Sequence, residues 1–399
     1  MNAERIRDAA AGMRPWLVEV RRTLHMSPEL GRREEATATL VCRWLEGLGV
    51  AHRRSGTAVT GLVEGDRPGL TVALRADIDA LPIREENDVE YRSRNEGAMH
   101  ACGHDAHMAI LLGAAKFFAS HRDALAGNVK LLFQPDEEGD GGAESMIGEG
   151  CLEDPRVDRV IGLHVMPYLA TGAIEVRHGV LNGSSTTLRI AVRGKGAHAA
   201  YPEQGIDAVL IAANVVTALN GLVARYVSPL DQAVITVGTI CGGIRANIIA
   251  EDVKMMATMR TTSDTLRDAL IERARAVVEG IPASYGGSGS LDVRYGYPAL
   301  VNHEQTVDAV AEVAGELFGN DAVRWKERPS MGVEDFSFFA RERHSAFYHL
   351  GCGNAAKGIT APLHTSRFEI DEDCLVTGVA MQIGVALRLL ERATPEGTT

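Results

Sequence analysis

Short apolar runs alternate with a longer helical pattern in the first half of the chain. Residues 71–74, 129–133 and 160–163 are short, largely apolar runs, and residues 108–118 have the apolar spacing of a helix. Strands with little polar alternation are typical of a parallel sheet whose two faces are covered by helices. The pattern therefore predicts an α/β fold with a mixed, largely parallel sheet, and functional loops at the carboxyl ends of its strands.

The pattern changes near Ser184, where apolar and polar residues begin to alternate as in a strand with one exposed face. The helix and strand patterns that follow lie at residues 206–222, 234–237, 253–259, 263–279 and 291–295. We expect Gly280 to end the second helix. The β-α-β-β-α-β order predicts a ferredoxin-like α+β domain in residues 184–296, inserted into a larger domain formed by residues 1–183 and 297–399.

Composition and charge narrow the classes of partner. The chain has 399 residues, of which 45% are hydrophobic and 24% charged, the balance of an ordinary globular protein. Its formal net charge of −12 repels phosphate backbones and anionic lipid headgroups, so we expect neither a nucleic acid nor a membrane as partner. The N-terminal residues mix both charge signs and lack the apolar core of a secretory signal, which favours a cytoplasmic protein. At the other end of the chain, residues 393–399 are predicted to form a polar tail.

Residues 100–107 concentrate one thiol, three imidazoles and a carboxylate. Cys102 and His104 flank Gly103, which allows a turn tight enough for both side chains to face one ion, and zinc prefers these ligand types. The six cysteines are widely spaced, which indicates reduced thiols rather than disulfides. We favour a metal site here over a turn with a buried cysteine and solvated histidines.

Further ligand types follow other predicted strands. Glu137 and Glu138 come shortly after the run of residues 129–133, where one carboxylate could bind a metal while the other moves protons. His164 ends the run of residues 160–163, and His364 lies near the C-terminus. The structural alternatives are a solvated acidic turn for the glutamates and core positions for the histidines. The candidates gain weight together, because the carboxyl ends of parallel strands meet at one edge of a sheet.

Asp77 and Asp79 follow the first apolar run. A carboxylate in such a place either orients a metal-bound histidine through its ring N–H or caps a turn. Both interpretations stay open at this point.

Two glycine-rich loops occur in the predicted inserted domain. His198 lies in residues 194–200, and Asn247 ends the loop of residues 242–247. Glycines allow a backbone to approach a ligand closely, although a simple hairpin turn explains them equally well.

Nucleophilic catalysis is the main chemical alternative to a metal site. A serine hydrolase elbow is excluded because Ser185 has no glycine two residues later. A cysteine nucleophile at Cys102 with a neighbouring imidazole stays possible. This mechanism would leave four candidate residues without a role, namely Glu137, Glu138, His164 and His364.

Taken in order, these motifs resemble the M20 metallopeptidase family, and within it the N-acyl-amino-acid amidohydrolases that include hippurate hydrolases and plant auxin-conjugate hydrolases. The matching segments run from residues 25–30 through the 100–107 cluster to residues 363–364 and 368–372, so the resemblance covers nearly the full chain. One departure is Ser27, where the family often has a histidine.

The resemblance implies a site for two divalent metal ions, with zinc, manganese, cobalt and nickel all admissible. Cys102 would bridge the ions, His104 and His164 would complete the ligands of one, and Glu138 and His364 those of the other. Glu137 falls at the position of the general base, which takes a proton from a metal-activated water and delivers it to the leaving amine.

The resemblance also implies that the inserted domain is a lid and dimerisation domain. His198 would then help to hold the oxyanion, from its own chain or across a dimer, and Asn247 would contact the carboxylate of the substrate. A homodimer or higher homo-oligomer is expected on this ground alone.

Three functions follow as hypotheses. The first is metal-dependent hydrolysis of the amide bond of N-acyl or N-aroyl amino acids. The second is a metal-dependent dipeptidase or carboxypeptidase that uses the same site. The third, a metal-binding protein without turnover, is disfavoured by Glu137. The acyl group, the preferred amino acid and the metal are not determined by the sequence.

Overall fold

The computed structural model describes residues 1–391, and these form two compact units. The larger unit comprises residues 1–179, 301–327 and the described residues from 335 onward, and the smaller unit comprises residues 180–300 and 328–334. The tail predicted at residues 393–399 lies outside the described part of the chain. Residues 328–334 were expected in the large domain, but backbone hydrogen bonds from Gly183 to Ser330 and Gly332 join them to the smaller unit.

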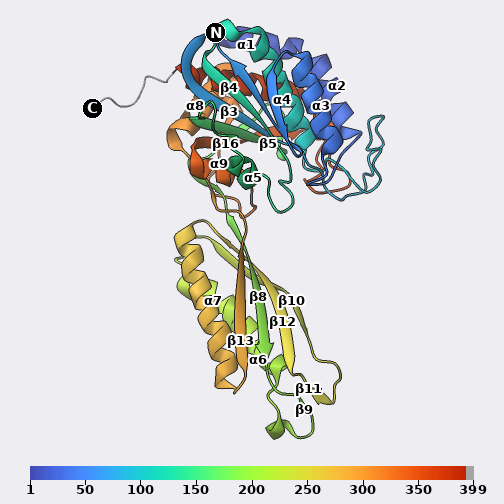
Figure 1. The fold of residues 1–399 in the computed structure, drawn as a ribbon, viewed down its shortest axis with the longest axis vertical. Coiled ribbons are helices and arrows are strands. Elements are labelled where there is room, and N and C mark those ends of the chain that lie inside the picture. Colours follow the sequence, from blue (N-terminus) through green and yellow to red (C-terminus); the bar gives the residue numbers. More distant parts are fainter. Residues whose placement is uncertain (392–399) are drawn as a thin grey trace, which may run out of the picture. The chain divides into compact units, whose positions relative to one another are not determined.

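A mixed eight-stranded sheet lies at the centre of the larger unit (Figure 1). Its strands are β1 (Ala51–Ser55), β2 (Ala58–Glu64), β3 (Arg67–Asp77), β4 (Ala126–Gln134), β5 (Arg159–Ala170), β6 (Ile174–Val176), β15 (Val323–Trp325) and β16 (His344–Gly353). The order is β1-β2-β4-β3-β5-β16-β6-β15, and the central strands β4, β3, β5 and β16 run parallel to their neighbours in that group. The predicted α/β class with a largely parallel sheet is confirmed.

Helices cover this sheet on both faces. They are α1 (Ala3–Gly12), α2 (Arg14–His25), α3 (Glu35–Gly47), α4 (His104–Ser120), α5 (Ala143–Gly148), α8 (Glu304–Phe318), α9 (Ser337–Glu342) and α10 (Asp373–Glu391). The nearly fully buried α4 and α10 pack against each other and against β3 and β4. A Cβ atom on Gly113 of α4 would lie 2.6 Å from a methyl group of Val379 of α10, so this close helix packing requires glycine.

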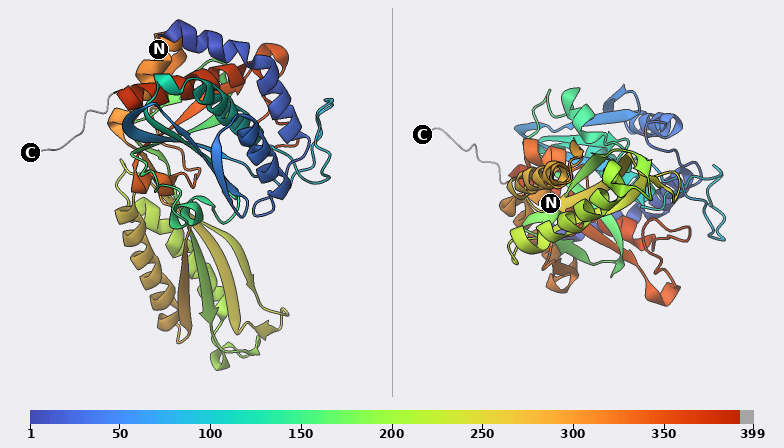
Figure 2. Two further views of the ribbon diagram at one scale, coloured as in Figure 1. Left: turned by 45° about the horizontal axis from the view of Figure 1, so that its top comes forward. Right: turned by 90° about the horizontal axis from the view of Figure 1, so that it is seen from below.

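The smaller unit has the predicted β-α-β-β-α-β order. Its main elements are β8 (Ser184–Arg193), α6 (Ala208–Tyr226), β10 (Ala233–Gly242), β12 (Asp252–Thr261), α7 (Asp264–Ser284) and β13 (Ser288–Tyr295). The strands form an antiparallel sheet in the order β10-β12-β8-β13, and both helices lie on one face of it (Figure 2). Two short strands, β7 (Gly179–Asn182) and β14 (Leu300–Asn302), mark where the chain enters and leaves this unit.

Two sequence expectations about element ends are wrong. Helix α7 does not end at Gly280 but continues to Ser284, because Val278 and Pro282 are buried on the helix face that contacts β13. His164 does not end its strand, since β5 continues to Ala170 alongside β16. In both cases, tertiary contacts extend an element beyond its local signal.

Helices α6 and α10 are long and apolar enough to cross a membrane by length and composition alone. Their most apolar windows are 33% and 83% buried, respectively, within the folded chain. Core helices of folded domains pass the same test, so this is weak evidence for a membrane span.

Candidate metal centre

A tight turn before α4 presents the first two candidate ligands. Gly103 has φ +85° and precedes His104, the first residue of the helix. A Cβ atom at Gly103 would lie 2.3 Å from a methyl group of Val165, so both the backbone conformation and the lack of space require glycine. Cys102 and His104 are thereby held on either side of this turn and are both buried.

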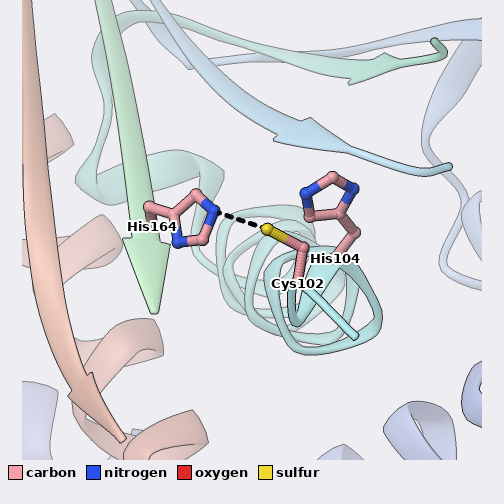
Figure 3. A group of neighbouring side chains, drawn as sticks. All are labelled: Cys102, His104 and His164. Atoms are coloured by element: carbon pink, nitrogen blue, oxygen red, sulfur yellow. Dashed lines mark hydrogen bonds between the residues drawn. The ribbon is translucent and has the colours of Figure 1, made fainter. Parts of the chain in front are cut away.

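Cys102 is shared by two groups of side chains that come from distant parts of the sequence. One group is Cys102, His104 and His164, and the other is Cys102, Glu138 and His364, with the ligand atoms of each group within 4.8 Å of one another. The Cys102 Sγ atom lies 3.3 Å from Nε2 of His164 and 3.2 Å from Nε2 of His364. Figure 3 shows the imidazoles of the first group on either side of the sulfur.

His104 has one ring nitrogen engaged in hydrogen bonding, and the other lies 3.6 Å from Oδ2 of Asp77. Its Nδ1 lies 2.9 Å from the backbone oxygen of Asp79 and 3.2 Å from the Asp79 carboxylate. Within residues 1–391, its buried Nε2 has no hydrogen-bond partner. Burial opposes the charged form, but the carboxylates of Asp77 and Asp79 outweigh this and raise the pKa of His104 to about 10. The surroundings therefore favour positive charge at this nitrogen, which a cation can supply in place of a proton.

His164 is held as a neutral ligand. Burial, together with the nearby His107, lowers its pKa well below the usual value. Its Nδ1 donates to the backbone oxygen of Val165 at 2.7 Å, which leaves the Nε2 lone pair facing the Cys102 sulfur. This is the state that a metal requires of an imidazole.

Glu137 and Glu138 lie in the loop after β4. The backbone N–H of Glu138 donates to the Asp79 carboxylate at 2.9 Å, and its Oε1 lies 3.0 Å from Nε2 of His364. Glu137 is 8% exposed, and one of its carboxylate oxygens lies within 4.8 Å of ligand atoms of His104 and Glu138. The general-base candidate is therefore next to both groups of ligands.

The donor set fits a pair of divalent ions. Burial, followed by the carboxylates of Glu138 and Glu137, raises the pKa of the Cys102 thiol well above its usual value. A thiolate at this position therefore needs positive charge beside it, which divalent ions provide. Thiolate, imidazole and carboxylate are all ligands of first-row divalent metals.

His198 and Asn247 lie together in the smaller unit. His198 belongs to β9 (Ala197–His198), which pairs with β11 (Ile248–Ile249), and the N–H of Ala199 donates to the backbone oxygen of Asn247. Both residues are exposed. The two glycine-rich loops thus form one antiparallel ribbon.

Sequence reasoning missed a buried network behind the ligand turn. Arg21 and His25 of α2 each lie 2.8 Å from Oδ2 of Asp105, the residue after His104. Arg21 also reaches Glu369, five positions after His364. The helical spacing of Arg21 and His25 on α2 is a local sign that the two side chains share one helix face. No local pattern predicts partners as distant in sequence as Asp105 and Glu369.

Asp77 and Asp79 both lie beside histidine rings, and Oδ2 of Asp77 is also 3.6 Å from Nε2 of His104. Asp79 contacts the ring of His104, as an orienting carboxylate would, whereas Asp77 lies 2.6 Å from Nδ1 of His107. His107 in turn accepts a hydrogen bond at Nε2 from the N–H of Val165. His107 therefore links α4 to β5, and although it groups with Asp77 and His104 as a possible ligand, both of its ring nitrogens are engaged.

Known proteins similar to this chain agree with the geometry. Residues 73–388 match the model of Peptidase family M20/M25/M40. The crystal structure of the Bacillus subtilis YXEP protein, a dinuclear metal binding peptidase from the M20 family, has a TM-score of 0.84 and 29% identity over 96% of this chain and 100% of that one.

Two curated relatives are similar over most of their length. A thermostable carboxypeptidase 2 of Saccharolobus solfataricus is 35% identical over 96% of this chain and 98% of its own. An N-acetyldiaminopimelate deacetylase of Priestia megaterium is 39% identical over 84% and 89%, respectively. This chain belongs to the M20 peptidase family and is a metal-dependent amide hydrolase that uses two divalent metal ions.

Proposed function

We propose that this enzyme hydrolyses the amide bond of N-acyl or N-aroyl amino acids. One observation carries the proposal: two groups of possible metal ligands share Cys102, and the Glu137 carboxylate lies beside both groups. The similarity to a deacetylase of an N-acetylated amino acid supports this substrate class.

We assign the ligands from the two groups. Cys102 would serve both ions, His104 and His164 would complete the ligands of one, and Glu138 and His364 would complete those of the other. When bound, two such ions polarise an amide carbonyl and lower the pKa of water. Zinc, manganese, cobalt and nickel are all compatible with this mixture of ligands.

In this mechanism Glu137 moves the proton. Its carboxylate accepts a proton from the attacking water as the carbonyl carbon becomes tetrahedral, and then gives that proton to the amine nitrogen as the amide bond breaks. The low exposure of Glu137 supports this role, because a carboxylate shielded from bulk water transfers its proton to the substrate rather than to solvent.

The smaller unit contributes substrate contacts in this proposal. His198 donates a hydrogen bond to the developing oxyanion, and Asn247 donates one to the substrate carboxylate. Their shared ribbon supports a joint role, since the backbone pairing of β9 with β11 holds the two residues near each other. Whether His198 serves its own chain or a partner is part of the test of the oligomeric state.

We propose a homodimer formed through the smaller unit. Among the described strands, β10 has a neighbour on one side of its sheet only, and it exposes Val234 and Ile240. The adjacent helix α6 exposes Val209 and Leu210. An edge strand with exposed apolar residues is suited to pairing with a second copy. Lysine at Val234 and Ile240 should then yield a monomer in sedimentation experiments, and an unchanged mass would contradict this interface.

The test of the substrate class is release of free amino acid by protein stripped with chelator and reloaded with zinc, manganese or cobalt. N-Acetyl, N-benzoyl and N-indoleacetyl amino acids should be hydrolysed only after reloading. The second candidate, a dipeptidase or carboxypeptidase, is favoured by the 35% identity to a carboxypeptidase. That candidate would be selected instead if the enzyme hydrolyses unblocked dipeptides, or removes the C-terminal residue of longer peptides, and does not hydrolyse any of the N-acyl amino acids.

A further inference from the structure

Asp136, the residue before Glu137, has an unusual backbone conformation. Its φ is +56°, in the left-handed region that residues other than glycine seldom occupy, and the residue is 5% exposed. A buried residue holds such a conformation only when its surroundings compensate for the strain. The contacts around Asp136 must therefore hold it in this conformation.

Two of those contacts come from the segment of residues 31–34, between α2 and α3, and a third comes from Gly141. The N–H of Asp136 donates to Oε1 of the buried Glu34 at 2.9 Å. The Nε of Arg32 donates to Oδ2 of Asp136 at 2.7 Å, and Arg32 itself has φ +63°. The backbone oxygen of Asp136 accepts from the N–H of Gly141 at 3.1 Å. Backbone and side chain of Asp136 are thus both anchored.

The carboxylate of Asp136 also fills a slot between two glycines. A Cβ atom at Gly31 or at Gly139 would lie 2.2 Å from Oδ1 of Asp136. Neither glycine has a positive φ, so the space taken by Oδ1, rather than the backbone, excludes a larger residue there. Because Arg32 holds the other oxygen, the carboxylate cannot simply turn away.

The other end of the same loop is fixed independently. The N–H of Glu138 donates to the Asp79 carboxylate, which also contacts the ring of His104. Glu137 lies between these two anchors, one at Asp136 and one at Glu138. The contact at Glu138 fixes a proposed metal ligand to the residue that contacts His104. The contacts at Asp136 fix the other side of Glu137.

We propose that Asp136 is a positioning residue for Glu137, held by Arg32, Glu34 and the slot between Gly31 and Gly139. It acts on the reaction through Glu137 and does not hold metal. The proposal rests on the proposed function, in which Glu137 transfers the proton. A carboxylate displaced by about 1 Å from its productive position can lose about a hundredfold in rate.

The experiment compares kcat, KM and bound metal per chain among variants of the metal-loaded enzyme. Asp136→Ala should lower kcat by about 10- to 100-fold, with KM and metal content nearly unchanged. Asp136→Asn should restore kcat to within about threefold, because its amide oxygen can still accept from Arg32 and asparagine tolerates the left-handed region. Equal losses in Asp136→Asn and Asp136→Ala would mean that charge, not position, matters, and would overturn the proposal.

Two further comparisons remain informative if Asp136→Ala folds poorly. Arg32→Ala, at a largely exposed side chain, should lower kcat in the same direction, whereas Arg33→Ala on the neighbouring exposed arginine should not. Gly139→Ala should lower kcat in the wild-type background but have little further effect together with Asp136→Ala, since the clashing oxygen is then gone. If Gly139→Ala lowers kcat as much in the Asp136→Ala background as in the wild type, the side chain of Asp136 does not fill the space beside Gly139.

Glu137→Gln separates this inference from the proposed function. If Glu137→Gln is inactive while Asp136→Ala has normal kcat, only the positioning role fails. If Glu137→Gln retains full kcat, the proton-transfer role of Glu137 fails, and the positioning proposal fails with it.

Discussion

The Sγ atom of Cys102 lies 3.2 Å from Nε2 of His364, although 262 positions separate the two residues in the sequence. This distance suits two ligands of one ion. The same sulfur also faces His164, and this shared position is the basis of the proposal that Cys102 serves both ions.

Cys102→Ser should therefore remove metal from both positions rather than from one. A serine hydroxyl is a poorer and less readily ionised ligand than a thiol, so we expect far less than the wild-type metal content and no measurable turnover. Metal analysis of the purified protein checks this. Cys241→Ser, at an exposed cysteine of the smaller unit, is the matched control and should bind metal normally. Loss of a single ion from Cys102→Ser would refute the bridging role.

Glu137→Gln should leave both ions bound and lower kcat by about 10²- to 10⁴-fold, the range expected for loss of a general base. The amide keeps the size of the side chain but accepts no proton from the attacking water. Turnover and metal content, measured on the same preparation, distinguish a general base from a metal ligand. Loss of metal in this variant would indicate that Glu137 is a ligand.

His198→Ala should lower kcat by about two orders of magnitude without changing the metal content, as expected when a donor to an oxyanion is removed. Steady-state kinetics and metal analysis test this together. His178→Ala, at a histidine of the larger unit that pairs with Asp308, serves as the control. An unchanged rate for His198→Ala would exclude the oxyanion role.

Arg21→Met should lower the free energy of unfolding by about 3–5 kcal/mol, because it leaves the buried Asp105 carboxylate without its guanidinium partner. Denaturant unfolding measures the change. Arg22→Met removes a neighbouring arginine whose side chain is 40% exposed, and its effect should be much smaller. Similar losses in both variants would mean that the burial of the Arg21 pair is energetically unimportant.

Glu175 should stabilise the fold at neutral pH and lose this effect in acid. Burial opposes its ionised form, but hydrogen bonds from His349, Lys326 and Tyr168 outweigh burial and lower its pKa to about 2. A carboxyl whose pKa is lower in the folded than in the unfolded chain adds stability above the unfolded value of about 4.3, and this stability disappears as the pH falls toward 2.

The measurement is unfolding of wild type and Glu175→Gln between pH 2 and pH 7. The wild type should be the more stable protein at pH 7, and the difference should shrink as Glu175 becomes protonated. A difference that stays constant over this range would show that the carboxylate charge contributes nothing.

Local patterns in the sequence were sufficient for the architecture. The apolar runs of β3, β4 and β5 and the alternation of β8 and β12 each reflect the burial of one strand, so they identified a largely parallel sheet and a β-α-β-β-α-β unit. The same patterns misjudged the ends of β5 and α7, because β16 and β13 extend those elements through contacts that are distant in sequence.

The residue types of the candidate centre were likewise readable, since Cys102, Glu138 and His364 carry side chains that bind metals. Only the tertiary structure decided which of them lie close enough to share an ion, because that depends on the distance between segments and not on their spacing along the chain. It also decided that Asp79 contacts Nδ1 of His104 while Asp77 lies between His104 and His107, and that Asp136 lies in a slot between two glycines. A sequence records which groups are available, whereas burial and the directions of hydrogen bonds, which select their roles, arise only when distant strands and loops pack together.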